Sequence, residues 1–173
     1  MTDVLWDMLS LEHGTLAVVV QQGRLCRVCY ERSADSASET IRRLYPSAER
    51  SSQPLVRQAL EQLTEYFLGK RRTFDVPLDQ HALSDFARKV HQALVNVPYG
   101  SVVTYGELAA LVGSPRAARA VGRVMSSNPF PLIVPCHRVV NVDGSIGQYS
   151  AANGARTKAW LIDLERDLAG EDV

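Results

Sequence analysis

The sequence predicts an α+β protein in which a small N-terminal unit of strands and helices precedes a mostly helical C-terminal unit. Two observations predict this class. Apolar, largely β-branched runs at residues 16–20 and 25–30 flank the turn-forming segment 21–24, which is typical of a β-hairpin. From about residue 82 onward the apolar residues instead recur at helical spacing. We place the boundary at a proline-containing linker, which predicts domains at 1–78 and 79–173.

The rest of the N-terminal unit is predicted to be two helices joined by loops. Residues 31–38 are small and polar, so we expect a loop there, followed by a short helix that ends at Leu44. Residues 54–68 place their apolar side chains on one helical face. Cys26 and Cys29 lie in the second strand, where positions three apart face opposite sides, so we interpret both as structural rather than as metal ligands.

Helical periodicity also covers both ends of the C-terminal unit. One helix is predicted from Ala82 to just before Pro98, with His91 on its apolar face as a packed core residue. Another is predicted over residues 157–168. Glu165 lies near its apolar stripe, where a carboxylate is costly unless it is paired.

Between these helices, the segment 104–125 predicts a helix-turn-helix. Thr104–Glu107 is a capping box that starts a short helix through Val112, and Ser114–Pro115 offers an N-cap and a first-turn proline for the next helix. That second helix, Arg116–Met125, mixes arginines with small side chains, which let a backbone approach a nucleic acid while arginines neutralise phosphate. A tightly packed internal helix is the alternative. The candidate DNA-contacting residues are Arg116, Ala117, Ala118, Arg119, Ala120, Gly122 and Arg123.

The chemistry is expected at Ile133–Val140, which reads Ile-Val-Pro-Cys-His-Arg-Val-Val. Cys136 carries the side chain closest to being a nucleophile at neutral pH, since a free thiol has a pKa of about 8.5. His137 is the side chain best able to take its proton. Pro135 has no backbone donor, so we expect a strand to end just before the thiol. A strand with a buried structural cysteine is the alternative on this dipeptide alone.

Composition limits the class of protein. Hydrophobic residues make up 46% and charged residues 22% of the 173, as in a soluble globular protein. We expect no membrane helix, because no uncharged apolar run approaches the roughly 20 residues required, and no secretory signal. Three cysteines without a framework spacing favour the cytoplasm. Between Phe86 and Trp160, eight basic residues oppose two acidic ones, a local charge of +6 in a chain of net charge zero. Such a face can meet phosphate, although uneven charge without a partner is possible.

The ordered series Arg119–Gly122, Asn128–Pro129 and Pro135–Val140 resembles the 6-O-alkylguanine-DNA alkyltransferases. The match extends over about residues 86–165, and the N-terminal part matches only in length and element type. The resemblance implies a protein, expected as a monomer, that binds duplex DNA through the minor groove and flips out an alkylated guanine. It also implies that Cys136 accepts the alkyl group once only, without a cofactor or metal.

The resemblance implies roles for the residues around the thiol. His137 is implied to act on Cys136 through a water molecule, and Glu165 to orient the imidazole. Asn128 is implied to tie the helix-turn-helix to the active-site turn, and Tyr105 to assist nucleotide rotation and protonation of the departing guanine. Arg119 is implied to fill the space of the flipped base. The implied pocket residues are Met125, Pro131, Val139, Tyr149, Ser150 and Lys158.

The sequence departs from the family pattern in two places and is compatible with three other functions. The loop 151–155 is longer than in many relatives and lacks a glycine pair, and the N-terminal cysteines and histidines do not reproduce the zinc-binding pattern of some relatives. A non-catalytic lesion-binding relative would lack the acceptor cysteine. A cysteine hydrolase would use Cys136, His137 and Glu165 over many turnovers, and a DNA-binding regulator would need only the helix-turn-helix.

Overall fold

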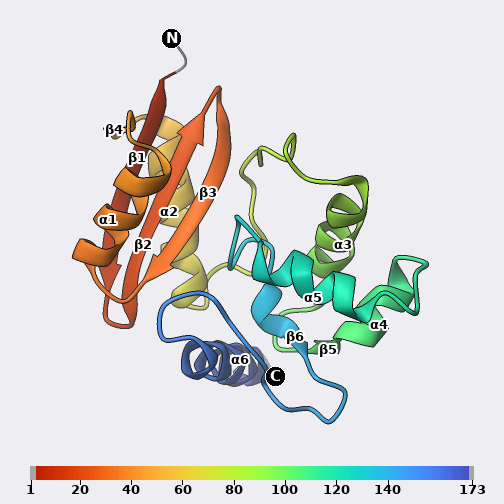
Figure 1. The fold of residues 1–173 in the computed structure, drawn as a ribbon. Helices are drawn as coiled ribbons and strands as arrows, with labels where there is room; N and C mark the ends of the chain where they lie inside the picture. The colour runs from red at the N-terminus through yellow and green to blue at the C-terminus, as the bar shows by residue number, and fades with distance from the viewer. Residues whose placement is uncertain (1–2, 172–173) are drawn as a thin grey trace. The chain divides into compact units, whose positions relative to one another are not determined.

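The computed structural model describes residues 3–171, which divide into two compact units between His81 and Ala82. The predicted α+β class is confirmed, because the first unit contains a sheet and the second is mostly helical (Figure 1). In the part of the chain that is described, no helix is long and apolar enough to cross a bilayer.

The N-terminal unit is a four-stranded sheet with one helix on each face (Figure 1). The strand order is β3-β2-β1-β4, with β1, β2 and β3 antiparallel and β4 parallel to β1. The central strand β2 is buried along nearly its whole length, because α1 and α2 cover its two faces. Its elements are β1 (Val4–Leu11), β2 (Gly14–Gln21), β3 (Arg24–Glu31), α1 (Ala34–Leu44), β4 (Glu49–Arg50) and α2 (Pro54–Phe67).

Several N-terminal predictions are confirmed and two are corrected. The hairpin turns at Gln22 and Gly23, both with positive φ, and Cys29 packs in the core beneath α1. Residues 4–11, for which the sequence predicted no strand, pair with β2 along their full length. The predicted loop over residues 31–38 is wrong, because α1 already begins at Ala34. Ser33 and Ser36 exchange side-chain-to-backbone hydrogen bonds there, as a capping box made of serines.

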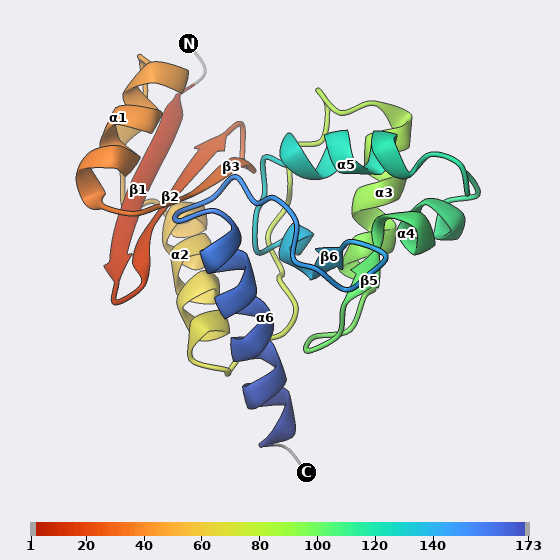
Figure 2. The same ribbon diagram turned by 60° about the horizontal axis from the view of Figure 1, so that its bottom comes forward.

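The C-terminal unit places its helices around a short parallel pair of strands. In this pair Val103 lies opposite Val139 (Figure 2). Buried residues from α3 and α6 form its core, and His91 is one of them, as predicted. Its elements are α3 (Asp85–Val95), β5 (Val103–Thr104), α4 (Tyr105–Leu111), α5 (Ala118–Ser126), the 3₁₀ turn η1 (Cys136–Arg138), β6 (Val139–Val140) and α6 (Ala155–Gly170).

The helix-turn-helix consists of α4 and α5, but its second helix starts later than predicted. The Thr104–Glu107 capping box forms as expected. Ser114 does not cap α5; instead its carbonyl accepts from the amide of Ala117 in a separate turn. Arg116 and Ala117 therefore precede α5 rather than lie within it.

The predicted strand before the active-site cysteine is also wrong. The apolar run 130–135 is buried but makes its hydrogen bonds locally: the amide of Val134 donates to Phe130 and that of Cys136 to Val134. These turns satisfy the buried backbone without a sheet partner. The thiol consequently sits at the start of a 3₁₀ turn.

Candidate active site

A cavity of about 730 Å³ opens in the C-terminal unit, with Cys136 in its wall. This volume is in the range of pockets that hold small molecules or a single base. Its lining comes from α4, α5, the loop after β6 and the first turn of α6. The lining residues are Tyr105, Arg119, Gly122, Arg123, Met125, Ser126, Cys136, Asn141, Gly147, Gln148, Tyr149, Ser150, Ala155 and Lys158.

The thiol of Cys136 is nearly inaccessible to solvent and is not in a disulfide. Burial raises the pKa of this thiol, an effect that the Asn128 side chain and the Lys158 charge partly oppose. The group therefore rests as a thiol at neutral pH and needs a base at the moment of reaction.

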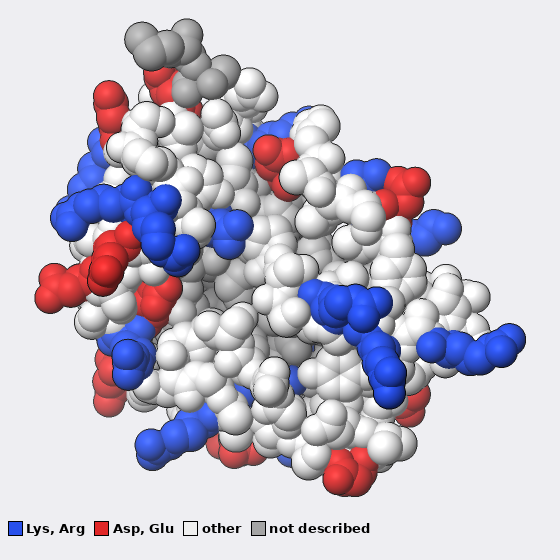
Figure 3. Space-filling view, in the orientation of Figure 1, with Lys and Arg blue, Asp and Glu red and all other residues white. Residues whose placement is uncertain are grey.

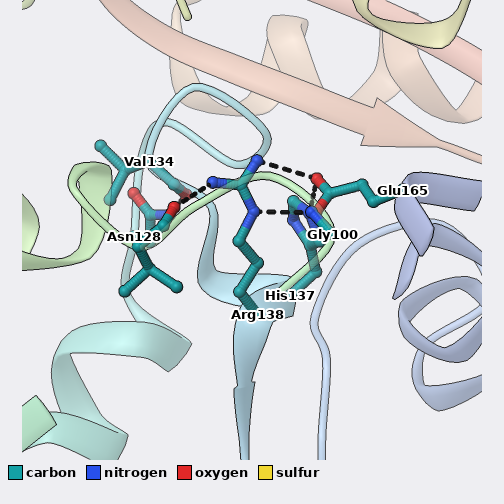
Figure 4. A network of polar contacts seen from close by, with 7 residues as sticks. Gly100, Asn128, Val134, His137, Arg138 and Glu165 are labelled. Carbon is teal, nitrogen blue, oxygen red and sulfur yellow. Dashed lines mark hydrogen bonds and ion pairs between the residues drawn. The ribbon is translucent and has the colours of Figure 1, made fainter. Parts of the chain in front are cut away.

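His137, the residue after the cysteine, forms a buried pair with Glu165 of α6 (Figure 4). Nε2 of His137 lies 2.6 Å from Oε1 of Glu165. Burial lowers the pKa of His137, although Glu165 acts to raise it. Burial alone would raise the pKa of Glu165, but hydrogen bonds from His137 and Arg138 hold it below its usual range. The carboxylate is thus ionised and the imidazole neutral, with its proton on Nε2.

Sequence reasoning missed the second partner of this carboxylate, Arg138. Its Nε donates to Oε2 and its Nη2 to Oε1 of Glu165, each at 2.9 Å (Figure 4). The amide of Gly100 adds a bond to Oε2 at 3.2 Å. Gly100 has a φ of +81°, and a Cβ there would lie 2.9 Å from Ala169, so glycine is needed for this approach. A signal was available: an arginine directly after the Cys-His pair, in a buried apolar run.

Asn128 links the end of α5 to the buried segment that carries the thiol (Figure 4). Its Nδ2 donates to the carbonyl of Val134 at 2.9 Å, and its Oδ1 accepts from the amide of Phe130 at 2.9 Å. Both ends of the amide are used, so the side chain fixes the turn at both its start and its end.

Lys158, another residue of the cavity lining, is only 1% exposed and lies beside Tyr105 and the carbonyl of Gln148. Its ammonium is 5.7 Å from the Tyr105 ring centroid. Burial lowers the pKa of Lys158 and raises that of Tyr105. Lys158 and Cys136 line the same cavity, and the positive charge of Lys158 acts to lower the pKa of the thiol.

The arginines of the helix-turn-helix are all exposed. Arg119 and Arg123, one helical turn apart on α5, line the cavity together with Gly122. Figure 3 shows basic side chains standing out over the region of α5. Ala118 and Ala120 are half-buried on the same helix and do not reach the cavity lining as described.

Two predicted pocket residues lie elsewhere. Pro131 and Val139 are buried and do not belong to the lining within residues 3–171, because Pro131 is in the buried turn and Val139 pairs with Val103. Met125, Tyr149, Ser150 and Lys158 do line the cavity. The lining residues that the sequence did not suggest are Ser126, Asn141, Gly147, Gln148 and Ala155.

Comparison with known families explains this arrangement. Residues 85–167 match the 6-O-methylguanine DNA methyltransferase DNA-binding domain, and residues 4–80 match the ribonuclease-like domain of the same family. The chain belongs to this family. The resemblance inferred from the cysteine motif is confirmed.

Individual relatives agree along most of the chain. The constitutive methylated-DNA–protein-cysteine methyltransferase of Bacillus subtilis is 37% identical over 154 residues, 88% of this chain and 90% of the relative. The O6-methylguanine methyltransferase structure of Mycobacterium tuberculosis has a TM-score of 0.77 at 31% identity, covering 96% of this chain and 94% of that one. A DNA complex of the M. tuberculosis protein has a TM-score of 0.76 at 33% identity, covering 95% and 94%.

Proposed function

We propose that this methyltransferase repairs DNA by direct reversal, moving an alkyl group from the 6-oxygen of guanine in duplex DNA to Cys136. One observation carries the proposal: a buried thiol lines a base-sized cavity, and the next residue, His137, is hydrogen-bonded to the buried carboxylate of Glu165. The relatives' names as cysteine methyltransferases of methylated DNA support it.

The chemistry is a displacement at the alkyl carbon. The thiol proton passes through a water molecule to Nδ1 of His137, because Nε2 already donates to Glu165. A sulfur–carbon bond forms as the carbon–oxygen bond breaks, and the electron pair of that bond stays with the guanine. Tyr105 supplies a proton to the departing base, whose developing negative charge the Lys158 ammonium also stabilises. The product is a thioether, which does not hydrolyse, so each molecule acts once.

The cavity lining fits a flipped base that is held mainly by shape and by a few polar groups. Met125 and Tyr149 provide apolar walls, while the backbone near Ser150 and Cys136 offers hydrogen-bonding groups for the guanine edge. Asn128 serves as the hinge that fixes the end of α5 relative to the buried turn that leads to the thiol.

DNA binding is assigned to α5, which approaches through the minor groove. The small residues Ala118, Ala120 and Gly122 allow close approach, and Arg119 takes the place of the extruded base. Arg116 and Ala117, in the turn before α5, and Arg123 contact the phosphate backbone. The exposure of the arginines beside the cavity supports this assignment.

We further propose that the protein acts as a monomer in the cytoplasm. The reaction consumes a reduced thiol, which a reducing compartment preserves. Light scattering of the protein in solution tests the monomer.

The decisive test is a titration with duplex DNA that contains 6-O-methylguanine. We expect repair to stop at one methyl group per protein molecule, with the mass of one methyl added to the peptide that contains Cys136. Cys136→Ser should bind the same duplex and transfer nothing. Tight binding with unchanged protein mass would instead indicate a lesion-binding protein, and many repairs per molecule would indicate a true turnover enzyme.

A further inference from the structure

Arg138 is buried in the active site, yet the proposed reaction gives it no step. Its side chain is 5% exposed, and it donates through one fork to both oxygens of Glu165. Its remaining terminal nitrogen, Nη1, donates to the carbonyl of Val97 at 2.7 Å, and its guanidinium lies 5.6 Å from the Tyr99 ring centroid. The guanidinium is therefore fixed on three sides.

The net charge of the buried cluster depends on Arg138. Glu165 contributes one negative charge and Arg138 one positive charge, so the two are neutral together before His137 is protonated. A proton on His137 would then give the cluster a net positive charge, although the side chains of His137 and Glu165 are only 0% and 1% exposed. Without Arg138, the same proton would instead complete a neutral imidazolium–carboxylate pair.

We propose that Arg138 is a positioning residue that keeps His137 in its neutral, proton-accepting form by neutralising Glu165. The inference rests on the proposed alkyl transfer, because only a reaction that removes the Cys136 proton needs that base. Glu165 has two duties that conflict when it acts alone. Glu165 must orient the imidazole of His137 through Nε2. Its negative charge must not, however, stabilise a second proton on that ring.

The charged groups around His137 agree with this role. From η1, Arg138 lowers the pKa of His137, as does Lys158 from α6, whereas Glu165 from α6 raises it. Cys136, the adjacent residue, rests as a neutral thiol because burial raises its pKa. Tyr99 faces the guanidinium from the turn before β5. Arg138 donates two hydrogen bonds to Glu165 itself, so its removal changes the charge balance directly.

The test is the single-turnover rate of methyl transfer as a function of pH. For the parent protein we expect little loss of rate between pH 8 and pH 6. For Arg138→Gln we expect an acidic limb whose midpoint moves up by at least one pH unit, with the rate recovering at high pH. Arg138→Lys keeps the charge and should keep the parent midpoint. A rate that falls by one constant factor at every pH would show that Arg138 serves only packing, and would overturn the proposal.

A double variant separates electrostatics from structure. In Arg138→Gln/Glu165→Gln the carboxylate that attracts the second proton is gone, so the midpoint should return toward the parent value even if the rate stays low. A midpoint that remains shifted in the double variant would contradict the charge-balance argument.

A further measurement uses the parent protein, so its result does not depend on whether a variant folds. Nitrogen NMR of ¹⁵N-histidine-labelled protein should show His137 neutral, with the proton on Nε2, from pH 6 to pH 8. An imidazolium at pH 7 would overturn the inference. If His137 is neutral but no methyl group is ever transferred, the proposed function fails while this assignment of protonation stands.

Discussion

The C-terminal unit holds two sets of ionisable side chains, one buried and one exposed to solvent. In the first set, His137 and Arg138 are buried and both bond to the buried Glu165 at 2.6–2.9 Å. At the rim of the cavity, Arg119 and Arg123 project from α5 into solvent. The buried set interacts strongly because little water screens it, whereas each exposed arginine is screened by water and salt.

This difference in burial predicts which substitutions disturb the fold and which affect only binding. Removing Glu165 from the buried set leaves the Arg138 charge without its counter-ion, so both stability and methyl transfer should suffer. Removing an exposed arginine leaves the fold intact and subtracts one contact with a polyanion. Substitutions in the buried set should therefore have larger effects on stability than substitutions of the exposed arginines.

Glu165→Ala should produce the largest loss of stability. It leaves the Arg138 guanidinium buried without its carboxylate, and breaking a buried pair in this way costs about 3–5 kcal/mol. Urea denaturation measures the change in the free energy of unfolding. Asp163→Ala, an exposed position on the same helix, is the matched control and should change stability by less than about 0.5 kcal/mol. Equal effects of the two substitutions would show that the buried network adds nothing to stability.

His91→Leu should remove a pH dependence. His91 is 2% exposed, Nδ1 has no hydrogen-bond partner among the described residues, and the ring packs edge-on against Phe130. Burial lowers the pKa of His91 to about 4. Below pH 6.5 the unfolded chain therefore binds a proton that the folded chain refuses, and stability falls until about pH 4, by about 3 kcal/mol in total.

Denaturation at several pH values between 7 and 4 tests this slope. The loss of stability with falling pH should be smaller for His91→Leu than for the parent across the whole window. Glu165 does not mimic the effect there, because its pKa lies below its usual range and its contribution is lost only at more acidic pH. His81→Gln, at a side chain that is 83% exposed, should keep the parent slope. A parallel slope for His91→Leu would mean that the imidazole titrates normally.

The sequence predicted those features that depend on interactions between residues close together in the chain. The hairpin at Gln22–Gly23 and the capping box at Thr104 depend on a few adjacent residues, and both formed as expected. The cysteine motif was specific enough to indicate the family. The requirement that Glu165 be paired was also predicted, from a carboxylate on an apolar stripe.

Features that depend on tertiary context were missed. The apolar run before Cys136 was predicted as a strand, but its neighbours in space bury it as turns, which apolarity alone cannot distinguish. Arg138 and Gly100 meet Glu165 across 27 and 65 residues of sequence, respectively. Such partners follow from packing of the whole unit, so the sequence pointed to the acid but not to its second cation.

Asn128→Ala tests the connection between the two charged regions. Its amide joins the end of α5 to Val134, so truncation removes one of the two hydrogen bonds to the Val134 carbonyl and leaves the Phe130 amide without its partner. We expect a loss of about 2 kcal/mol in stability together with slower methyl transfer. Asn96→Ala, whose amide donates to Gln92 at the exposed end of α3, is the control and should leave the transfer rate unchanged. Normal transfer by Asn128→Ala would show that the hinge is not needed.

Arg123→Ala should give the smallest effect on the fold and a defined effect on binding. The side chain is exposed, so stability should change by less than about 0.5 kcal/mol. Binding to unmodified duplex DNA should weaken, and the slope of log affinity against log salt should become shallower by about 1, as expected for one lost phosphate contact. Arg166→Ala, an equally exposed arginine on α6 away from the cavity lining, controls for net charge. Fluorescence anisotropy at several salt concentrations gives both slopes. If Arg166→Ala makes the slope shallower by as much as Arg123→Ala does, the attraction depends on total charge, and the assignment of DNA binding to α5 is wrong.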